Sequence, residues 1–145
     1  MSSCADHTAP PYGAQRMTPQ RQLISDATAA REGAFSVEAL AVDVGSLDAT
    51  IGVATVYRAV TAMLASGWLE RVGERDGSAL FARCTAGGHH HHVVCDRCGR
   101  VATAECPLEG NVPRAAQGDG FVITRHEVTL YGLCPQCAAA DRDEE

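Results

Sequence analysis

The sequence contains no lysine, so every side chain that stays cationic at all ordinary pH values is an arginine. Twelve arginines stand against eighteen aspartates and glutamates, and the formal net charge at pH 7 is −6. Taken alone, this balance argues against a protein that binds nucleic acid. This argument against nucleic acid is weaker for residues 1–83, because more of the excess of acidic over basic residues lies in the second half of the chain. The acidic end DRDEE contributes much of that excess. Divalent metal ions bound to that half would offset more of it.

Long apolar runs and a signal peptide are also missing. No apolar run approaches the ~18 residues that a membrane-spanning helix needs, and the polar, proline-rich start lacks the pattern of a secretory signal. We therefore expect a cytoplasmic protein with no membrane partner. The 145 residues, of which 46% are hydrophobic, suffice for one compact domain or two small ones. Residues 1–14 are expected to form a flexible N-terminal arm.

The seven cysteines do not fit a disulfide framework. Their number is odd, and disulfides are rare in a reducing compartment. Four of them fall into two Cys-x-x-Cys pairs, which is the spacing of metal-binding knuckles. The cysteines therefore favour a metal-binding protein over a disulfide-stabilised one.

The first half of the chain has the pattern of three short helices. Thr18 is a favourable N-cap with Pro19 at the first helical position, and Ser36 can cap a second helix. Apolar residues at helical spacing follow both caps, and they recur in a third segment over about residues 54–66.

A β-hairpin is expected directly after these helices. The segments 68–72 and 79–83 have strand character, and Asp76-Gly77 between them is a strong turn signal. Three helices followed by a hairpin predict a winged helix-turn-helix over residues 15–84. The alternative is a generic small α+β domain.

The second half is rich in strand patterns. The expected strands cover residues 89–95, 100–106 and 121–132. A crossover helix is expected within residues 107–120, although Gly110 and Pro113 weaken it. We assign residues 85–138 to a metal-binding α/β domain and residues 139–145 to an acidic tail.

The two Cys-x-x-Cys pairs predict a structural zinc site. Each pair can chelate one ion from a tight turn, and two pairs complete the tetrahedron that zinc favours. A redox dithiol at residues 134–137 is the competing interpretation, but it leaves the other pair unexplained. The predicted ligands are Cys95, Cys98, Cys134 and Cys137.

Four consecutive histidines, residues 89–92, indicate two further sites. Side chains alternate between the faces of a strand, so His89 and His91 point one way and His90 and His92 the other. Each pair needs about two more ligands. Spacing alone does not choose among the candidates, which are Glu70, Cys84, Glu105, Glu109, His126 and Glu127.

A zinc hydrolase is not expected. Zinc deaminases carry H-x-E and P-C-x-x-C, whereas here His126 and Glu127 are adjacent and Pro135 lies inside its knuckle. No H-E-x-x-H segment occurs either. Without an open metal position and a placed base, we predict that the protein is not an enzyme.

Five segments of the sequence can be compared with known families, namely TPQR at 18–21, ATVYRAV at 54–60, GWLERV at 67–72, CTAGGHHHHVVCDRCG at 84–99 and HEVTLYGLCPQC at 126–137. Together they resemble the ferric uptake regulator family, and within it most closely the zinc uptake regulators of actinobacteria. They occur in the family's order and span about residues 15 to 137. The resemblance implies a homodimeric, metal-dependent repressor that binds palindromic operator DNA and controls zinc uptake genes, with an α+β fold in which a winged helix precedes a dimerisation domain.

The resemblance also implies how the ligands are grouped, with two or three Zn²⁺ per protomer. The structural zinc falls on the four knuckle cysteines. A sensing site at the hinge between the domains falls on Glu70, Cys84, His90 and His92. A site within the dimerisation domain falls on His89, His91, Glu109 and His126, with Glu105 as a rival to Glu109.

The thiolate of Cys84 favours zinc at the hinge, because softer ligands suit zinc better than iron. An iron- or peroxide-sensing member of the family is the alternative, and a thiol redox or zinc-storage protein is a more remote one. The residues expected to contact DNA are Arg16, Arg21, Thr55, Tyr57 and Arg58.

Overall fold

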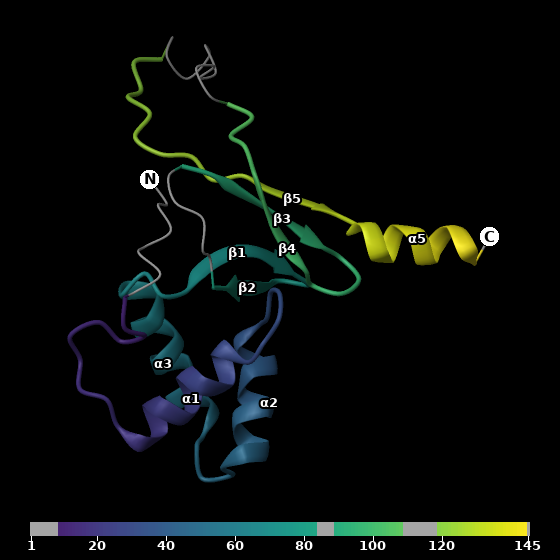
Figure 1. The fold of residues 1–145 in the computed structure, drawn as a ribbon. Helices are drawn as coiled ribbons and strands as arrows, with labels where there is room; N and C mark the ends of the chain where they lie inside the picture. Colours follow the sequence, from purple (N-terminus) through teal and green to yellow (C-terminus); the bar gives the residue numbers. More distant parts are fainter. Residues whose placement is uncertain (1–8, 84–88, 109–118, 145) are drawn as a thin grey trace.

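The computed structural model describes residues 9–83, 89–108 and 119–144. Three helices and a two-stranded hairpin form one part, and a three-stranded sheet with a C-terminal helix forms the other (Figure 1). This arrangement confirms the α+β fold class. Within the described ranges, none of the helices combines the length and the apolar character that crossing a membrane would require.

The first two helices begin where the capping residues predicted. Helix α1 covers Pro19–Ala29, and the Thr18 side chain accepts a hydrogen bond from the Arg21 backbone N–H at 3.2 Å. Helix α2 covers Val37–Leu47, and Ser36 accepts from the Ala39 N–H, also at 3.2 Å. In both cases the hydroxyl satisfies an N–H group that has no partner inside the helix.

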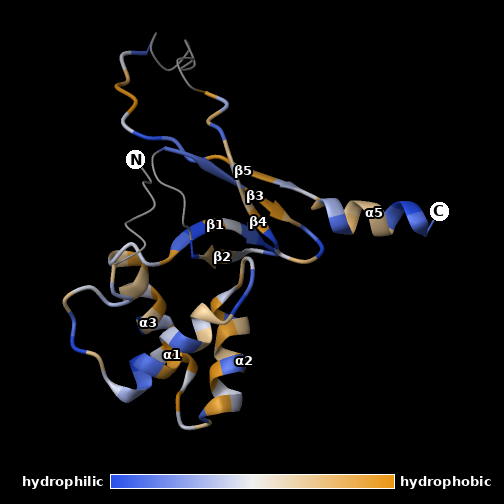
Figure 2. Ribbon diagram, in the orientation of Figure 1, coloured by the Kyte–Doolittle hydropathy of each residue, from blue (hydrophilic) through white to orange (hydrophobic). Residues whose placement is uncertain are grey.

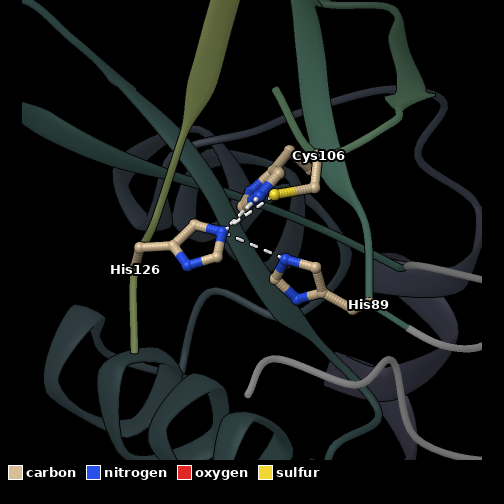
Figure 3. A group of neighbouring side chains, drawn as sticks. His89, Cys106 and His126 are labelled. Atoms are coloured by element: carbon tan, nitrogen blue, oxygen red, sulfur yellow. Dashed lines mark hydrogen bonds between the residues drawn. The ribbon is translucent and has the colours of Figure 1, made fainter. Parts of the chain in front are cut away.

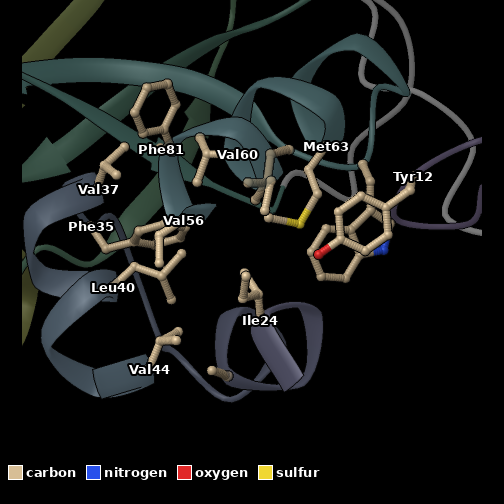
Figure 4. Close-up of a cluster of buried hydrophobic side chains, with 14 of the residues drawn as sticks. Tyr12, Ile24, Phe35, Val37, Leu40, Val44, Val56, Val60, Met63 and Phe81 are labelled. Atoms are coloured by element: carbon tan, nitrogen blue, oxygen red, sulfur yellow. The ribbon is translucent and has the colours of Figure 1, made fainter. Parts of the chain in front are cut away.

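Helix α3 covers Val53–Ala65 and packs across α1 and α2. It starts after Gly52, one residue before the predicted start, and Gly67 ends it with a φ of 79°. Hydrophobic residues predominate in α2 and α3 (Figure 2). The fully buried side chains Ile24, Leu40, Val56 and Met63 meet in the centre (Figure 4).

The N-terminal segment belongs to this core in part, so the prediction of a flexible arm over residues 1–14 is wrong for residues near Tyr12. The Tyr12 side chain is only 2% exposed, and its hydroxyl donates to the Arg21 carbonyl at 2.8 Å. The Ser66 hydroxyl donates to the Pro11 carbonyl at 2.7 Å. Burying an aromatic ring against a helix contributes more free energy than is lost when the short segment that carries the ring becomes ordered.

Strands β1, Glu70–Arg75, and β2, Ser78–Ala82, form the predicted hairpin. Its two-residue turn has positive φ at both positions, 51° at Asp76 and 80° at Gly77, as a turn matched to strand twist requires. The hairpin follows the three helices directly, so the first part is a winged helix.

The second sheet has the order β4-β3-β5. Strand β3, His91–Cys95, pairs antiparallel with β4, Val101–Ala104, and parallel with β5, Thr129–Gly132. The predicted long strand over 121–132 is wrong for residues 121–128. In the observed register, Thr129 of β5 pairs with His92, the second residue of β3. Residues 121–127 therefore lie beyond the start of β3 and have no strand of the described residues beside them to pair with.

Helix α5 covers Pro135–Asp143 and replaces most of the expected acidic tail. Cys134 is its N-cap and Pro135 occupies the first turn, where a missing N–H costs nothing. The prediction of a tail over residues 139–145 is therefore wrong for 139–143. The predicted crossover helix falls largely on residues 109–118, which lie outside the described residues.

Strand β1 joins the two parts of the protein. The Thr129 hydroxyl donates to the Val72 carbonyl at 3.0 Å, and the Glu74 N–H donates to the Tyr131 hydroxyl at 2.8 Å. Between these contacts lies Gly73, where an added Cβ would sit 2.7 Å from the Tyr131 oxygen. The second sheet is thus held close against the wing.

The turn after β3 makes further contacts with the winged helix. The Arg75 guanidinium donates to the Cys95 carbonyl at 3.1 Å. The Ala34 N–H donates to the Gly99 carbonyl at 2.7 Å, next to Gly33, whose φ is 78°. The first Cys-x-x-Cys turn therefore supports the winged helix directly.

Replacing Gly73 by alanine should weaken this junction. The new methyl group would displace the Tyr131 ring and break its hydrogen bond with Glu74, which should lower the free energy of unfolding by about 1–2 kcal/mol. Denaturant unfolding of the zinc-loaded protein measures the effect. Gly45→Ala is the matched control, because its Cβ would meet no atom within 4 Å in α2. Equal stability of Gly73→Ala and the wild type would contradict the close junction.

Candidate metal centres

The four knuckle cysteines lie together at one end of the second sheet. Cys95 ends β3, Cys98 follows in the turn, and Cys134 and Cys137 begin α5. Their sulfur atoms lie within 4.8 Å of one another, and those of Cys98 and Cys134 are 3.7 Å apart. A tetrahedral zinc with Zn–S bonds of about 2.3 Å needs sulfur atoms ~3.8 Å apart. The four-cysteine cluster therefore has the size of a zinc site.

Backbone groups in the two turns favour thiolates in this cluster. Hydrogen bonds from the backbone of Cys98 and Cys134 lower the pKa of the Cys95 thiol to about 6. The Cys137 backbone lowers the pKa of Cys134 in the same way. The hydrogen bond with the Cys134 side chain instead raises the pKa of Cys137 to about 12, because Cys137 keeps the proton that it shares with the Cys134 sulfur. A divalent cation would replace that proton and bind both sulfur atoms.

A second group, which we name the hinge cluster, joins the wing to β3 and consists of Glu70, His90 and His92. Glu70 is the first residue of β1, and both histidines are buried. The His92 Nε2 atom lies 3.8 Å from a Glu70 carboxylate oxygen. This nitrogen is buried and has no hydrogen-bond partner among the described residues. A metal ion bound by these three side chains would supply the missing partner.

Burial also sets the charge states of the hinge cluster. It raises the pKa of Glu70, and together with the neighbouring His90 and His91 it lowers the pKa of His92 to about 4. The His92 ring is therefore neutral at pH 7 and keeps the lone pair that a metal needs. Cys84, the fourth residue expected at this site, lies outside the described residues.

A third group, the three-histidine cluster, consists of His89, His91 and His126. The Nε2 atom of His126 lies 3.1 Å from the Nε2 atoms of both other histidines. The sulfur of Cys106 lies 3.0 Å from the same atom (Figure 3). These four side chains form a second set of possible metal ligands within 4.8 Å of one another.

Sequence reasoning missed Cys106, because it belongs to neither Cys-x-x-Cys pair. The useful signal was its position two residues after a strand that pairs with β3, where Ala104 lies opposite His91. The candidate Glu105 is exposed and does not belong to the cluster, and the same holds for Glu127. Glu109 lies outside the described residues.

The hinge and three-histidine clusters open onto the same cleft between the wing and the second sheet. Its volume is about 730 Å³, and residues of β1, the histidine run and the segment before β5 line it. Both clusters are therefore accessible to small ions, although most of their histidines are buried.

The residues expected to contact DNA lie on or near helices of the winged part. On α3, Tyr57 and Arg58 are exposed, and the Arg58 guanidinium donates to the Thr55 hydroxyl at 3.1 Å. The Tyr57 hydroxyl donates to the Glu38 carboxylate at 2.6 Å and lowers its pKa, so Glu38 stays anionic. Arg58 is therefore the stronger candidate for an anionic partner.

The two arginines near α1 differ in how many intramolecular contacts their side chains make. Arg16 is exposed, whereas the Arg21 guanidinium donates to the Gln15 side chain and to the Arg16 carbonyl, each at 2.7 Å. It also lies 5.2 Å from the centre of the Tyr12 ring. Arg21 therefore holds the segment before α1 and has fewer donors available for a partner.

A winged helix attached to a small sheet with several possible metal sites defines a class of proteins that combine these two parts. Residues 13–131 match the sequence profile of the Ferric uptake regulator family, and the chain belongs to that family. This confirms the resemblance seen in the sequence.

Curated relatives share about a third of the aligned residues. The chain is 38% identical over 88 residues to the ferric uptake regulation protein of Legionella pneumophila, which covers 60% of this chain and 64% of that protein. It is 34% identical over 88 residues to the transcriptional regulator FurA of Mycobacterium tuberculosis, covering 59% and 58%. The chain thus spans about three fifths of the length of these relatives.

Solved structures extend the likeness to the whole fold. A zinc uptake regulator complexed with zinc and DNA superposes with a TM-score of 0.69 at 24% identity, covering 88% of this chain and 86% of that one. The Vibrio cholerae ferric uptake regulator gives a TM-score of 0.55 at 28% identity, covering 82% and 92%. A zinc-bound manganese uptake regulator gives 0.55 at 31% identity, covering 83% and 91%.

Replacing Cys95 or Cys134 by serine should unfold the second part of the chain. The four-cysteine cluster joins β3 to α5, and a metal bound there contributes its binding energy to folding. We expect loss of tightly held zinc, measured by elemental analysis after dialysis, together with loss of ordered structure by circular dichroism. Cys4→Ser, outside both knuckles, is the control. A Cys95→Ser protein that keeps its zinc and its fold would refute the site.

Proposed function

We propose that this protein is a zinc-responsive transcriptional repressor, which binds palindromic operator DNA as a metal-loaded homodimer and controls zinc uptake genes in the cytoplasm. The hinge cluster carries this proposal. Its carboxylate belongs to the winged helix and its two imidazoles belong to the second sheet, so one ion there would bind both parts at once. The buried nitrogen of His92, which has no hydrogen-bond partner in the part of the chain that the structure describes, is the observation that favours an ion over a simple hydrogen-bond network.

The proposed mechanism follows from the fact that the hinge ligands belong to two parts of the protein, the winged helix and the second sheet. Zinc, when bound, would supply a fixed point between β1 and β3, with Glu70, His90, His92 and Cys84 as its ligands. This fixes the angle between the winged helix and the second domain. In a dimer, that angle sets the distance between the two recognition helices, and half-sites one helical turn apart accept only certain distances. With an ion between them, Glu70, His90 and His92 would hold the two parts at one angle and so raise the population of the DNA-competent state.

The second domain is proposed as the dimerisation surface. Apolar side chains on and before β5 are exposed in the single chain, including Leu130 at 47% and Val122 at 86%. Exposed apolar residues that gather along one edge are typical of a surface that another chain covers. The proposed domain division is residues 15–84 for DNA binding and 85–138 for metal binding and dimerisation.

Helix α3 is proposed as the recognition helix, with Thr55, Tyr57 and Arg58 facing the DNA and Arg16 and Arg21 near the phosphates. The similarity in fold to a zinc uptake regulator complexed with zinc and DNA favours a nucleic-acid partner. The winged part carries less of the chain's negative charge than the second part. A duplex would therefore meet the less acidic part of the molecule.

Iron sensing is the second candidate, since the curated relatives at 38% identity are named ferric uptake regulation proteins. Zinc is favoured by the chemistry of the hinge, where Cys84 would add a thiolate to two imidazoles and a carboxylate. Thiolate and imidazole ligands together suit zinc, whereas ferrous iron is more often bound by nitrogen and oxygen.

Removing one hinge ligand should abolish the zinc response without unfolding the protein. We expect Cys84→Ala and His92→Ala to keep the four-cysteine zinc and the dimer but to lose zinc-dependent operator binding. The measurement is operator binding against buffered free zinc for each variant and the wild type. His89→Ala, which changes the three-histidine cluster instead, is the matched control and should have a milder effect. A wild-type response in both hinge variants would sink the proposal, and a response to iron alone would favour the ferric alternative.

Arg58→Ala should weaken operator binding by about 1–3 kcal/mol if the guanidinium reads a base. The comparison is made at saturating zinc and fixed salt, because phosphate contacts depend on both. Arg142→Ala, which removes an exposed arginine from α5, is the control for lost charge. Unchanged affinity in Arg58→Ala would mean that this residue only solvates the helix surface.

A further inference from the structure

The three-histidine cluster contains a contact pattern that protons alone do not explain. The Nε2 atom of His126 has three neighbours at hydrogen-bond distance, namely the Nε2 atoms of His89 and His91 at 3.1 Å and the Cys106 sulfur at 3.0 Å. An imidazole nitrogen either donates one proton or accepts one through its single lone pair. Three such contacts to one nitrogen cannot all be hydrogen bonds, whereas a cation placed among the four atoms would accept a lone pair from each of them.

We propose that Cys106 is the fourth ligand of this site, which makes it a zinc centre of three imidazoles and one thiolate. The carboxylate of Glu109 is then not required. This assignment goes beyond the proposed hinge mechanism and does not depend on it, because none of the four ligands belongs to the winged helix.

The spacing of the four ligand atoms fits a small tetrahedral ion. With Zn–N bonds of about 2.0–2.1 Å and a Zn–S bond of about 2.3 Å, neighbouring ligand atoms lie ~3.3–3.6 Å apart. The three contacts at His126 are 3.0 and 3.1 Å, and all four atoms lie within 4.8 Å of one another. Small side-chain shifts therefore convert the present arrangement into a tetrahedron.

The sheet register brings these ligands together. His91 lies opposite Ala104 on β4, and Cys106 follows two residues later; His92 lies beside Thr129 on β5, and His126 precedes it by three residues. The segments that leave β4 and enter β5 therefore meet at the start of β3. A backbone hydrogen bond with Val128 also orients the His91 ring. Such a bond to the second ring nitrogen is the usual support of a metal-bound histidine.

The donor set defines the class of ion. A thiolate with three neutral imidazoles suits zinc, and cobalt as its spectroscopic substitute, better than manganese or magnesium, which prefer oxygen ligands. The carboxylates nearest in sequence, Glu105 and Glu127, are exposed and lie outside the cluster. Among the described residues, Cys106 is thus the side chain that completes the set.

Cobalt binding tests the assignment, because a thiolate ligand produces a sulfur-to-cobalt charge-transfer band that nitrogen and oxygen ligands do not. The test protein is the full chain with Cys4→Ser and Cys84→Ala and with zinc retained in the four-cysteine cluster. Cys106 is then the remaining thiol available to added cobalt. We expect the band to appear on titration, to vanish in an added Cys106→Ser variant, and to persist in an added Glu109→Gln variant.

Affinity gives a second readout. Cys106→Ser should weaken cobalt binding about tenfold or more, whereas Glu109→Gln and the control Glu105→Gln should leave it unchanged. Circular dichroism and retained zinc show that each variant is folded. Absence of the band in the test protein overturns the assignment, as does a loss of affinity in Glu109→Gln but not in Cys106→Ser. Operator binding is measured separately, so failure here leaves the hinge proposal standing, and the reverse also holds.

Discussion

The alternation of side chains along residues 89–95, which end in β3, is the constraint on which the metal chemistry of this protein depends. One extended segment of four histidines presents two to the wing and two to the opposite edge, because successive residues of a strand face opposite ways. A helix would have spread the same residues around its axis and could not have separated them into pairs. The strand ends at Cys95, so a third group of ligands follows in the same element. Five residues thus connect all three clusters.

The junction between the two parts uses backbone groups as much as side chains. The Gly99 and Cys95 carbonyls accept from Ala34 and Arg75, and the Tyr131 hydroxyl accepts from the Glu74 N–H. Two of these acceptors lie in the first knuckle, whose shape a metal ion would hold. The four-cysteine cluster therefore stabilises more than the second part of the protein. It also positions the carbonyl groups that accept hydrogen bonds from the winged helix, and the hinge cluster lies at the same junction.

Local features were predictable from the sequence, whereas those that depend on distant partners were not. The caps Thr18 and Ser36 and the Asp76-Gly77 turn act within a few residues, so their patterns sufficed. Residues 121–128 of the predicted strand have a composition typical of strands, but in the described part of the chain no neighbouring strand extends far enough to pair with them. The alternation argument anticipated how the histidines divide between two faces. Cys106 joins one of these groups only through the register of β4, which no spacing rule could supply.

The run of identical ligands also has a consequence for folding. Neighbouring imidazoles are chemically equivalent, so an ion that reached the run in the unfolded chain could capture the wrong pair. A slip of one residue would exchange the two faces and trap the strand in a misliganded state. Val94, which is completely buried, and the neighbouring Cys95 fix the register of the strand and thereby the face on which each histidine lies.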